Sequence, residues 1–223
     1  MRSGTSDALA PLRVLADSYA RRLPVRRVAV VGNAPLTESG ERADAIDACD
    51  VVVRVNSFVV DHPERDGRRS QGSRCDLVLW SRLVVATPDL FDRYSERLYV
   101  LLEPMRMYGR PEVWPPSWPA DLGFAVAPNA AVAIPLNTEL GYAWREEHLA
   151  PTTGTTAVWL AHRLWPDAEI LVAGLSFLDD PDQTSWQHQY GDEVVVGPEH
   201  RIAAESTLLR GWADDGRIRV LEG

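Results

Sequence analysis

Short apolar runs that end in glycine or a polar residue recur along this 223-residue chain, and helix-like stretches separate them. Runs that are hydrophobic throughout are typical of buried strands in a parallel sheet, and their alternation with helices indicates an α/β protein. We therefore expect one Rossmann-like domain over residues 1–223, with a mostly parallel sheet flanked by helices and residues 1–25 as a helical N-terminal extension. The predicted strands are 28–31, 51–55, 76–80, 98–102, 169–174 and 217–221.

The segments between these runs predict the helices and loops. Hydrophobic spacing favours helices over residues 153–164 and 198–214, a shorter one around 88–93 and a helical segment within 38–48. Residues 61–74 are polar and rich in glycine, so we expect a loop there. Residues 111–119 contain several prolines and are expected to be irregular.

Composition excludes several classes of function. The formal net charge of −9 argues against nucleic-acid or anionic-membrane partners, because both require a basic surface. No segment approaches the roughly 20 apolar residues of a membrane span, and the charged first 23 residues do not resemble a signal peptide. Cys49 and Cys75 have no metal-binding or redox spacing, which favours two reduced thiols and a cytoplasmic protein. The chain has no lysine, so Schiff-base chemistry is excluded.

Amide side chains follow the first two predicted strands. Gly32 and Asn33 end the first strand, and Asn56 ends the second. Ligands of open α/β sheets bind beyond the carboxyl ends of the strands, so both amides are expected in one crevice. An amide offers two N–H donors and one acceptor without charge, and so can bind phosphate or ribose without a metal. A plain turn at 32–33 and a capping role for Asn56 is the alternative.

A helix N-terminus provides the second candidate binding element. Thr152, Thr153 and Gly154 lie at the start of the predicted helix 153–164, and the next strand ends in Gly174. Free N–H groups at a helix start bind phosphate, and glycine at a strand end lets a ligand approach the main chain. One of the threonines is also expected to cap the helix.

Two histidines complete the set of candidate residues. Pro198 suits the first position of a helix, which predicts His200 in the first helical turn and favours a neutral imidazole able to act as a base. Glu205, about 140° further round an ideal helix, is expected to brace other groups rather than His200. His188 and Tyr190 lie in a polar loop that could fold over a bound phosphate.

In their order along the chain, these fragments resemble the four sialylmotifs of the family 29 glycosyltransferases, the eukaryotic-type sialyltransferases. The long motif is similar to the residues from Gly32-Asn33 to Arg54-Val-Asn56, and the short motif to the residues from Pro151 to Phe177. The third motif is matched by His188-Gln-Tyr190. The very short motif is matched by His200 and Glu205.

The resemblance implies a metal-independent, inverting glycosyltransferase that uses a CMP-sugar donor and no other cofactor. Its fold would be the GT-A-like variant of the sialyltransferase type, and its acceptor a small molecule or glycan. By the resemblance, His200 would be the catalytic base. The donor would be bound by Asn33, Asn56, Thr152, Thr153, Gly154, Gly174, His188 and Tyr190.

The sequence also departs from the family. The motifs are usually joined by a disulfide, but Val28 and roughly Trp165 stand at those positions, which fits a cytosolic bacterial relative. Ala150 replaces the tyrosine that commonly precedes the short-motif proline. Three alternatives stay open: a metal-dependent UDP-sugar transferase using Asp180-Pro-Asp182, a nucleotide-binding or hydrolytic domain that has lost transfer, and an S-adenosylmethionine methyltransferase.

Overall fold

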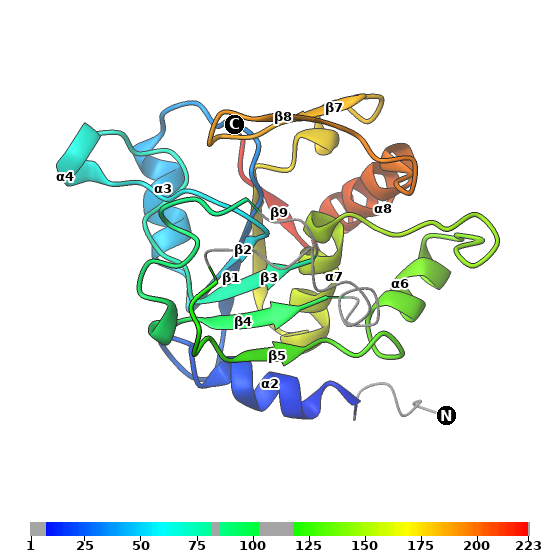
Figure 1. The fold of residues 1–223 in the computed structure, drawn as a ribbon, viewed down its shortest axis with the longest axis horizontal. Helices are drawn as coiled ribbons and strands as arrows, with labels where there is room; N and C mark the ends of the chain where they lie inside the picture. The colour runs from blue at the N-terminus through cyan, green and yellow to red at the C-terminus, as the bar shows by residue number, and fades with distance from the viewer. Residues whose placement is uncertain (1–7, 82–84, 103–117, 223) are drawn as a thin grey trace.

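The computed structural model describes residues 8–81, 85–102 and 118–222. It is a single α/β domain built on a seven-stranded parallel sheet with strand order β5-β4-β3-β2-β1-β6-β9 (Figure 1). The predicted fold class is confirmed. The strands are β1 (Arg27–Val31), β2 (Val51–Val55), β3 (Leu77–Trp80), β4 (Leu98–Leu101), β5 (Phe124–Val126), β6 (Glu169–Ala173) and β9 (Arg219–Val220).

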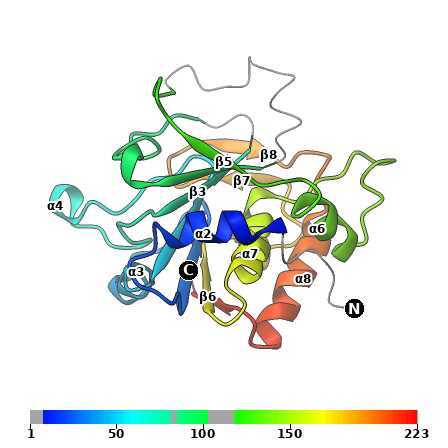
Figure 2. The same cartoon turned by 90° about the horizontal axis from the view of Figure 1, so that it is seen from below.

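Alternating side chains of the central strands bury both faces of the sheet. Val28 and Val30 of β1 belong to one core, together with apolar residues of α2 (Ala10–Asp17), α6 (Ala133–Glu139), α7 (Thr153–Leu164) and α8 (Ile202–Asp214). Ala29 and Val31 point to the opposite face, where Ile46 of α3 (Gly40–Asp47) covers them. Figure 2 shows α2, α6, α7 and α8 on their common side of the sheet. The period of two along β1 thus sets which helices cover which face.

Three smaller elements lie in the connections. A short helix, α4 (Pro63–Asp66), interrupts the predicted loop 61–74. The 3₁₀ turn η3 (Ser176–Leu178) follows β6, and an antiparallel hairpin joins β7 (Ser185–Gln187) to β8 (Glu193–Val195). Among the described residues, no helix is long and apolar enough to cross a membrane.

Two helix predictions need correction. Residues 88–93 form turns, and only the 3₁₀ turn η1 (Tyr94–Glu96) follows, because Arg93 adopts a left-handed conformation with φ of 46°. The predicted helix 198–214 begins four residues late, at Ile202, because His200 N–H bonds to Gly197 O in a turn. Helix 153–164 is confirmed with the predicted bounds, whereas residues 111–117, with Trp114, lie outside the described residues.

Candidate active site

A cavity of about 360 Å³ lies at the carboxyl edge of the sheet. The residues that directly follow six neighbouring strands line it, as expected for a ligand site in an open α/β sheet. They are Gly174 after β6, Gly32 after β1, Asn56 after β2, Ser81 after β3, Leu102 after β4 and Ala127 after β5.

All nine residues singled out from the sequence line this one cavity. They come from six separate parts of the chain: the ends of β1, β2 and β6, the start of α7, the β7–β8 hairpin and the segment before α8. They are Asn33, Asn56, Thr152, Thr153, Gly154, Gly174, His188, Tyr190 and His200. The fold brings them together, while their individual roles stay predictions.

The main chains of β1 and β6 approach closely at the floor of the cavity. Gly32 N–H donates to Ala173 O at 2.8 Å, and Gly174 adopts a φ of +67° that favours glycine. A Cβ atom added to Gly32 would lie 2.2 Å from Gly174 O, so only glycine fits there. Asn33 Nδ2 donates to Val55 O at 2.9 Å, which ties the end of β1 to β2.

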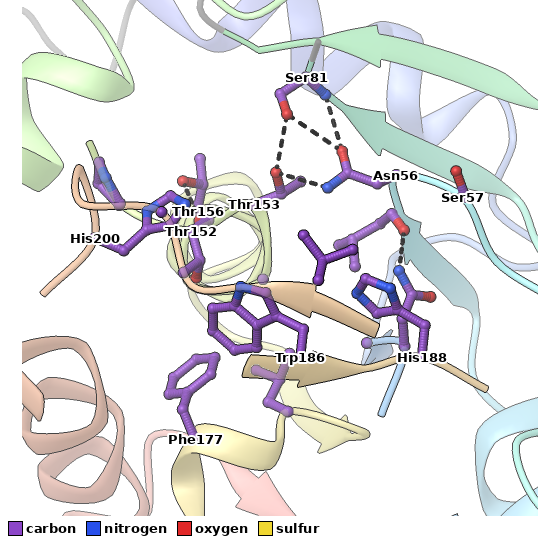
Figure 3. Close-up of a pocket in the computed structure, with 18 of the residues that line it drawn as sticks. Asn56, Ser57, Ser81, Thr152, Thr153, Thr156, Phe177, Trp186, His188 and His200 are labelled. Carbon is purple, nitrogen blue, oxygen red and sulfur yellow. Dashed lines mark hydrogen bonds between the residues drawn. The ribbon is translucent and has the colours of Figure 1, made fainter. Parts of the chain in front are cut away.

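Asn56 connects β2, β3 and α7 in a hydrogen-bond network (Figure 3). Its Nδ2 donates to Thr153 Oγ1 at 3.1 Å, and its Oδ1 accepts from Ser81 N–H at 3.0 Å. The hydroxyls of Ser81 and Thr153 are 3.3 Å apart. Sequence reasoning missed Ser81, although it follows a predicted strand in the same way as Asn33 and Asn56.

The N-terminus of α7 is fixed by a buried carboxylate. The Thr152 hydroxyl accepts from Thr155 N–H at 3.1 Å, which caps the helix as expected. Glu205 Oε2 in turn accepts from Thr152 N–H at 2.9 Å and from the Thr152 hydroxyl at 2.7 Å. Glu205 is fully buried, and this burial raises its pKa although the hydroxyls of Thr155 and Thr152 donate to it. Glu205 therefore braces Thr152, as predicted, and acts on His200 only through electrostatics, without a hydrogen bond between the two side chains.

His200 lies two residues before α8, so the prediction that it occupies the first helical turn is wrong. Its Nδ1 is 2.9 Å from Ala150 O. A carbonyl oxygen only accepts, so Nδ1 must carry the hydrogen, and in the neutral ring Nε2 is the basic atom. This contact, rather than a helix dipole, sets the tautomer of the ring. Figure 3 shows His200 with Thr152 and Thr156 at one side of the cavity and His188 at the other, while Trp186 lines the cavity as well.

The β7–β8 hairpin closes the other end of the cavity. His188 Nδ1 is 2.5 Å from Asp192 Oδ1, and the His188 ring stacks on Tyr190 with centroids 5.0 Å apart. Burial, assisted by the charge of Asp192, raises the pKa of Tyr190 to about 12, while a hydrogen bond with Ser57 acts in the opposite direction. Tyr190 therefore stays a neutral O–H group near neutral pH. Main-chain N–H of Gln189 donates to Asn33 O at 2.8 Å and attaches the hairpin to β1.

Two aromatic side chains that the motif comparison did not select also line the cavity. Phe177 and Trp186 meet edge to face, with ring centroids 6.2 Å apart. Trp186 comes from the hairpin and Phe177 from η3. From the sequence, Trp186 was one of four tryptophans that could stack on an acceptor, with Trp114, Trp118 and Trp144, and no spacing distinguished it from the others.

Several polar residues of the long-motif segment stabilise the fold and do not line the cavity. Ser39 caps α3 by accepting from Arg42 N–H at 3.2 Å. Asp47 and Asp50 accept from main-chain N–H groups of residues 73–74 and 26–27. Arg54 is buried and donates to the carbonyl groups of residues 71, 72 and 74.

The Asp180-Pro-Asp182 segment does not line this cavity, although Pro181 and Asp182 line a neighbouring hollow that also reaches His200. Asp182 N–H donates to Asp180 Oδ1 at 3.3 Å in an exposed turn after η3, and neither carboxylate is among the cavity-lining residues. Within residues 8–81, 85–102 and 118–222, no group of three or more histidine, cysteine, aspartate or glutamate residues is placed to hold a metal ion.

Comparison with known proteins identifies the fold. No protein-family profile and no curated protein matches the sequence. Solved structures do match in three dimensions, and two of them are crystal structures of a mammalian sialyltransferase. The fold is that of a sialyltransferase.

The two structural matches extend over most of the chain. The first, a complex with Gal-beta-1-3GalNAc-ortho-nitrophenol, has a TM-score of 0.58 and 18% sequence identity, and covers 89% of this chain and 70% of that one. The second has a TM-score of 0.54 and 17% identity, with 96% and 79% covered. At identities of 17–18%, these matches show a shared sialyltransferase-like fold and no more.

Proposed function

We propose that this chain is a metal-independent, inverting glycosyltransferase that transfers a sugar, sialic acid or another, from a CMP-linked donor to an acceptor hydroxyl. One observation carries the proposal. Nine residues chosen from sequence motifs line a single cavity at the carboxyl edge of a sialyltransferase-like sheet.

The polar end of the cavity suits the nucleotide. Asn33, Asn56 and the N-terminus of α7 would bind the ribose and phosphate, while Gly32 and Gly174 allow the nucleotide to approach the main chain. Tyr190, held by the hairpin, would donate to the phosphate. His188 would donate from Nε2 as an imidazolium ion, because the hydrogen of its Nδ1 is directed to Asp192 Oδ1. These donors and a helix end can stabilise the leaving phosphate, so the proposed reaction needs no divalent cation.

In the proposed reaction, Nε2 of His200 accepts the proton of the acceptor hydroxyl as that oxygen attacks the anomeric carbon. The bond between this carbon and the CMP oxygen breaks, CMP leaves with the bonding electron pair, and His200 releases its proton to solvent. The hydrogen bond from Nδ1 to Ala150 O keeps Nε2 available as the base.

A small molecule or glycan is the proposed acceptor, and a cytoplasmic, bacterial origin belongs to the same proposal. Gal-beta-1-3GalNAc, which one structural neighbour binds as an aryl glycoside, gives a first glycan to test. Both cysteines are buried and free, as is usual for a protein in a reducing compartment.

The proposal is tested by incubating the protein with CMP-N-acetylneuraminic acid, a panel of glycosides and EDTA, with product detection by mass spectrometry. A glycosylated product that depends on acceptor and forms in EDTA is expected. Product formed only from UDP-sugars with Mn²⁺ would replace it with the metal-dependent alternative. CMP release without any transfer product would favour the hydrolytic alternative.

A further inference from the structure

The cavity changes in chemical character along the edge of the sheet. After β1 and β2 its lining is polar, with Asn33 and Asn56, and after β6 it is the open main chain of Gly174. After β4 and β5, at the other side of the sheet, the corresponding residues are Leu102 and Ala127. The lining after the strands thus changes from glycines and amides at β6, β1 and β2, through the Ser81 hydroxyl after β3, to hydrocarbon at β4 and β5.

Elements that pack over this side of the sheet extend the apolar surface. Val132 immediately precedes α6, Ala133 begins it, and Ala150 lies just before the cap of α7. The side chains of Val132 and Ala150 are each only 2% exposed to solvent, whereas Ala133 is half-buried. We call Leu102, Ala127, Val132, Ala133 and Ala150 the apolar end of the cavity.

His200 borders this apolar end. Its ring is fixed by the 2.9 Å contact with Ala150 O, and Thr156 lies next to it (Figure 3). His188 and Asn33 mark the polar end. The two lie close together because Gln189, the residue after His188, donates its main-chain N–H to Asn33 O. If the donor phosphate occupies the polar end, the acceptor hydroxyl reacts beside His200. The rest of the acceptor then lies against the apolar end.

The five side chains of the apolar end have no hydrogen-bonding atoms. A hydroxyl-rich segment placed against them would lose its water without gaining partners, which is unfavourable. An apolar group would instead be stabilised by leaving water. The cavity therefore selects between acceptors by the polarity of the group next to the reacting sugar or hydroxyl.

We propose that the acceptor is amphipathic. It presents a hydroxyl to His200 and carries an aryl or alkyl group that occupies the apolar end of the cavity. This inference rests on the glycosyltransferase function proposed above and names the class of acceptor for it.

The test compares two acceptors that share one sugar. Isothermal titration of the CMP-saturated protein with phenyl β-galactoside and with methyl β-galactoside measures the contribution of the aryl group alone. We expect the phenyl glycoside to bind at least about tenfold more tightly. Equal affinities, or no detectable binding of the phenyl glycoside, would overturn the proposal.

A charged variant locates the aryl group. Ala133→Asp places a carboxylate in the apolar end at the first turn of α6, where the helix dipole favours it and the fold should tolerate it. This variant should lose the preference for the phenyl glycoside. Ala130→Asp, an exposed position three residues earlier outside the cavity lining, is the matched control and should keep it. A preference that persists in Ala133→Asp would mean that the aryl group binds elsewhere.

The first titration, with CMP alone, separates this inference from the function on which it rests. Normal CMP binding with no preference between the glycosides contradicts the acceptor class only. Failure to bind CMP contradicts the donor assignment, and the acceptor proposal is then overturned with it.

Discussion

His200 depends on a single main-chain contact for its proposed role. The bond from Nδ1 to Ala150 O leaves Nε2 as the free basic nitrogen, although His200 lies outside the helix in which the sequence placed it. The residue type was identifiable from its motif, but the carbonyl that orients it comes from 50 residues earlier in the chain. Such a partner becomes visible only when the fold is known.

His200→Ala should abolish transfer while leaving the nucleotide site intact. Loss of a general base typically lowers turnover by about 100-fold to 10,000-fold. The affinity for CMP should change by less than about twofold, because the polar end is lined by other residues. Product formation and CMP titration together check this. His162→Ala is the control, since His162 packs edge to face on Trp212 and is not a cavity-lining residue. Unchanged turnover in His200→Ala would contradict the assigned role.

The close approach of Gly32 to Gly174 permits no side chain. Gly32→Ala should destabilise the protein by more than about 2 kcal/mol, because the added Cβ would lie 2.2 Å from a main-chain oxygen. Gly211→Ala is the matched control, since its Cβ would meet nothing within 4 Å in the interior of α8, and it should stabilise by about 0.5–1 kcal/mol. Urea unfolding measures both changes. Equal stability of the two variants would contradict this account of the cavity floor.

At the scale of elements, Glu205 of α8 fixes the start of α7. The bonds from Thr152 N–H and hydroxyl to Glu205 Oε2 orient the helix end that carries Thr153. Glu205→Ala should lower the free energy of unfolding by about 3 kcal/mol, because both donors would be buried without a partner. Glu205→Gln keeps an acceptor oxygen and should retain most of this stability.

The same residue predicts a pH dependence. Burial raises the pKa of Glu205 in the folded protein, so the folded state binds the proton more tightly than the unfolded chain. The contribution of Glu205 to the free energy of unfolding is therefore greatest at pH values below the pKa that glutamate has in the unfolded chain. It decreases as the pH rises toward the higher pKa of Glu205 in the folded protein. Relative to the parent protein, Glu205→Gln should gain stability as pH rises from about 4 to about 7. Urea unfolding across that range measures the difference, and an opposite trend would contradict the assignment.

Sequence patterns predicted the long and strongly apolar elements best. A short run that is apolar throughout buries all its side chains when it forms a central strand, and such runs make up most of β1, β2, β3, β4 and β6. Helix α7 was predictable because it shows both a threonine cap and helical spacing. The three-residue strand β5 and the β7–β8 hairpin were missed because their apolar runs, residues 124–127 and 194–196, are too short to distinguish a strand from a loop. Tertiary contacts define them, through pairing with β4 and the attachment of the hairpin to β1.

At the scale of the whole molecule, the order of strands creates the site. Gly32 and Gly174, separated by more than 140 positions, meet because parallel strands all end at one edge, and this much followed from the predicted topology. The sequence could not show how the lining grades from amides to hydrocarbon across the sheet, because strand order decides which residues become neighbours.

The central claim is a metal-independent site for CMP, and isothermal titration tests it most directly. In EDTA, CMP should bind with saturation, and Asn33→Ala should weaken binding at least about tenfold. Thermal unfolding of that variant controls for loss of the Asn33 bond to Val55 O. No binding of CMP, or binding of UDP only when Mn²⁺ is present, would contradict the account.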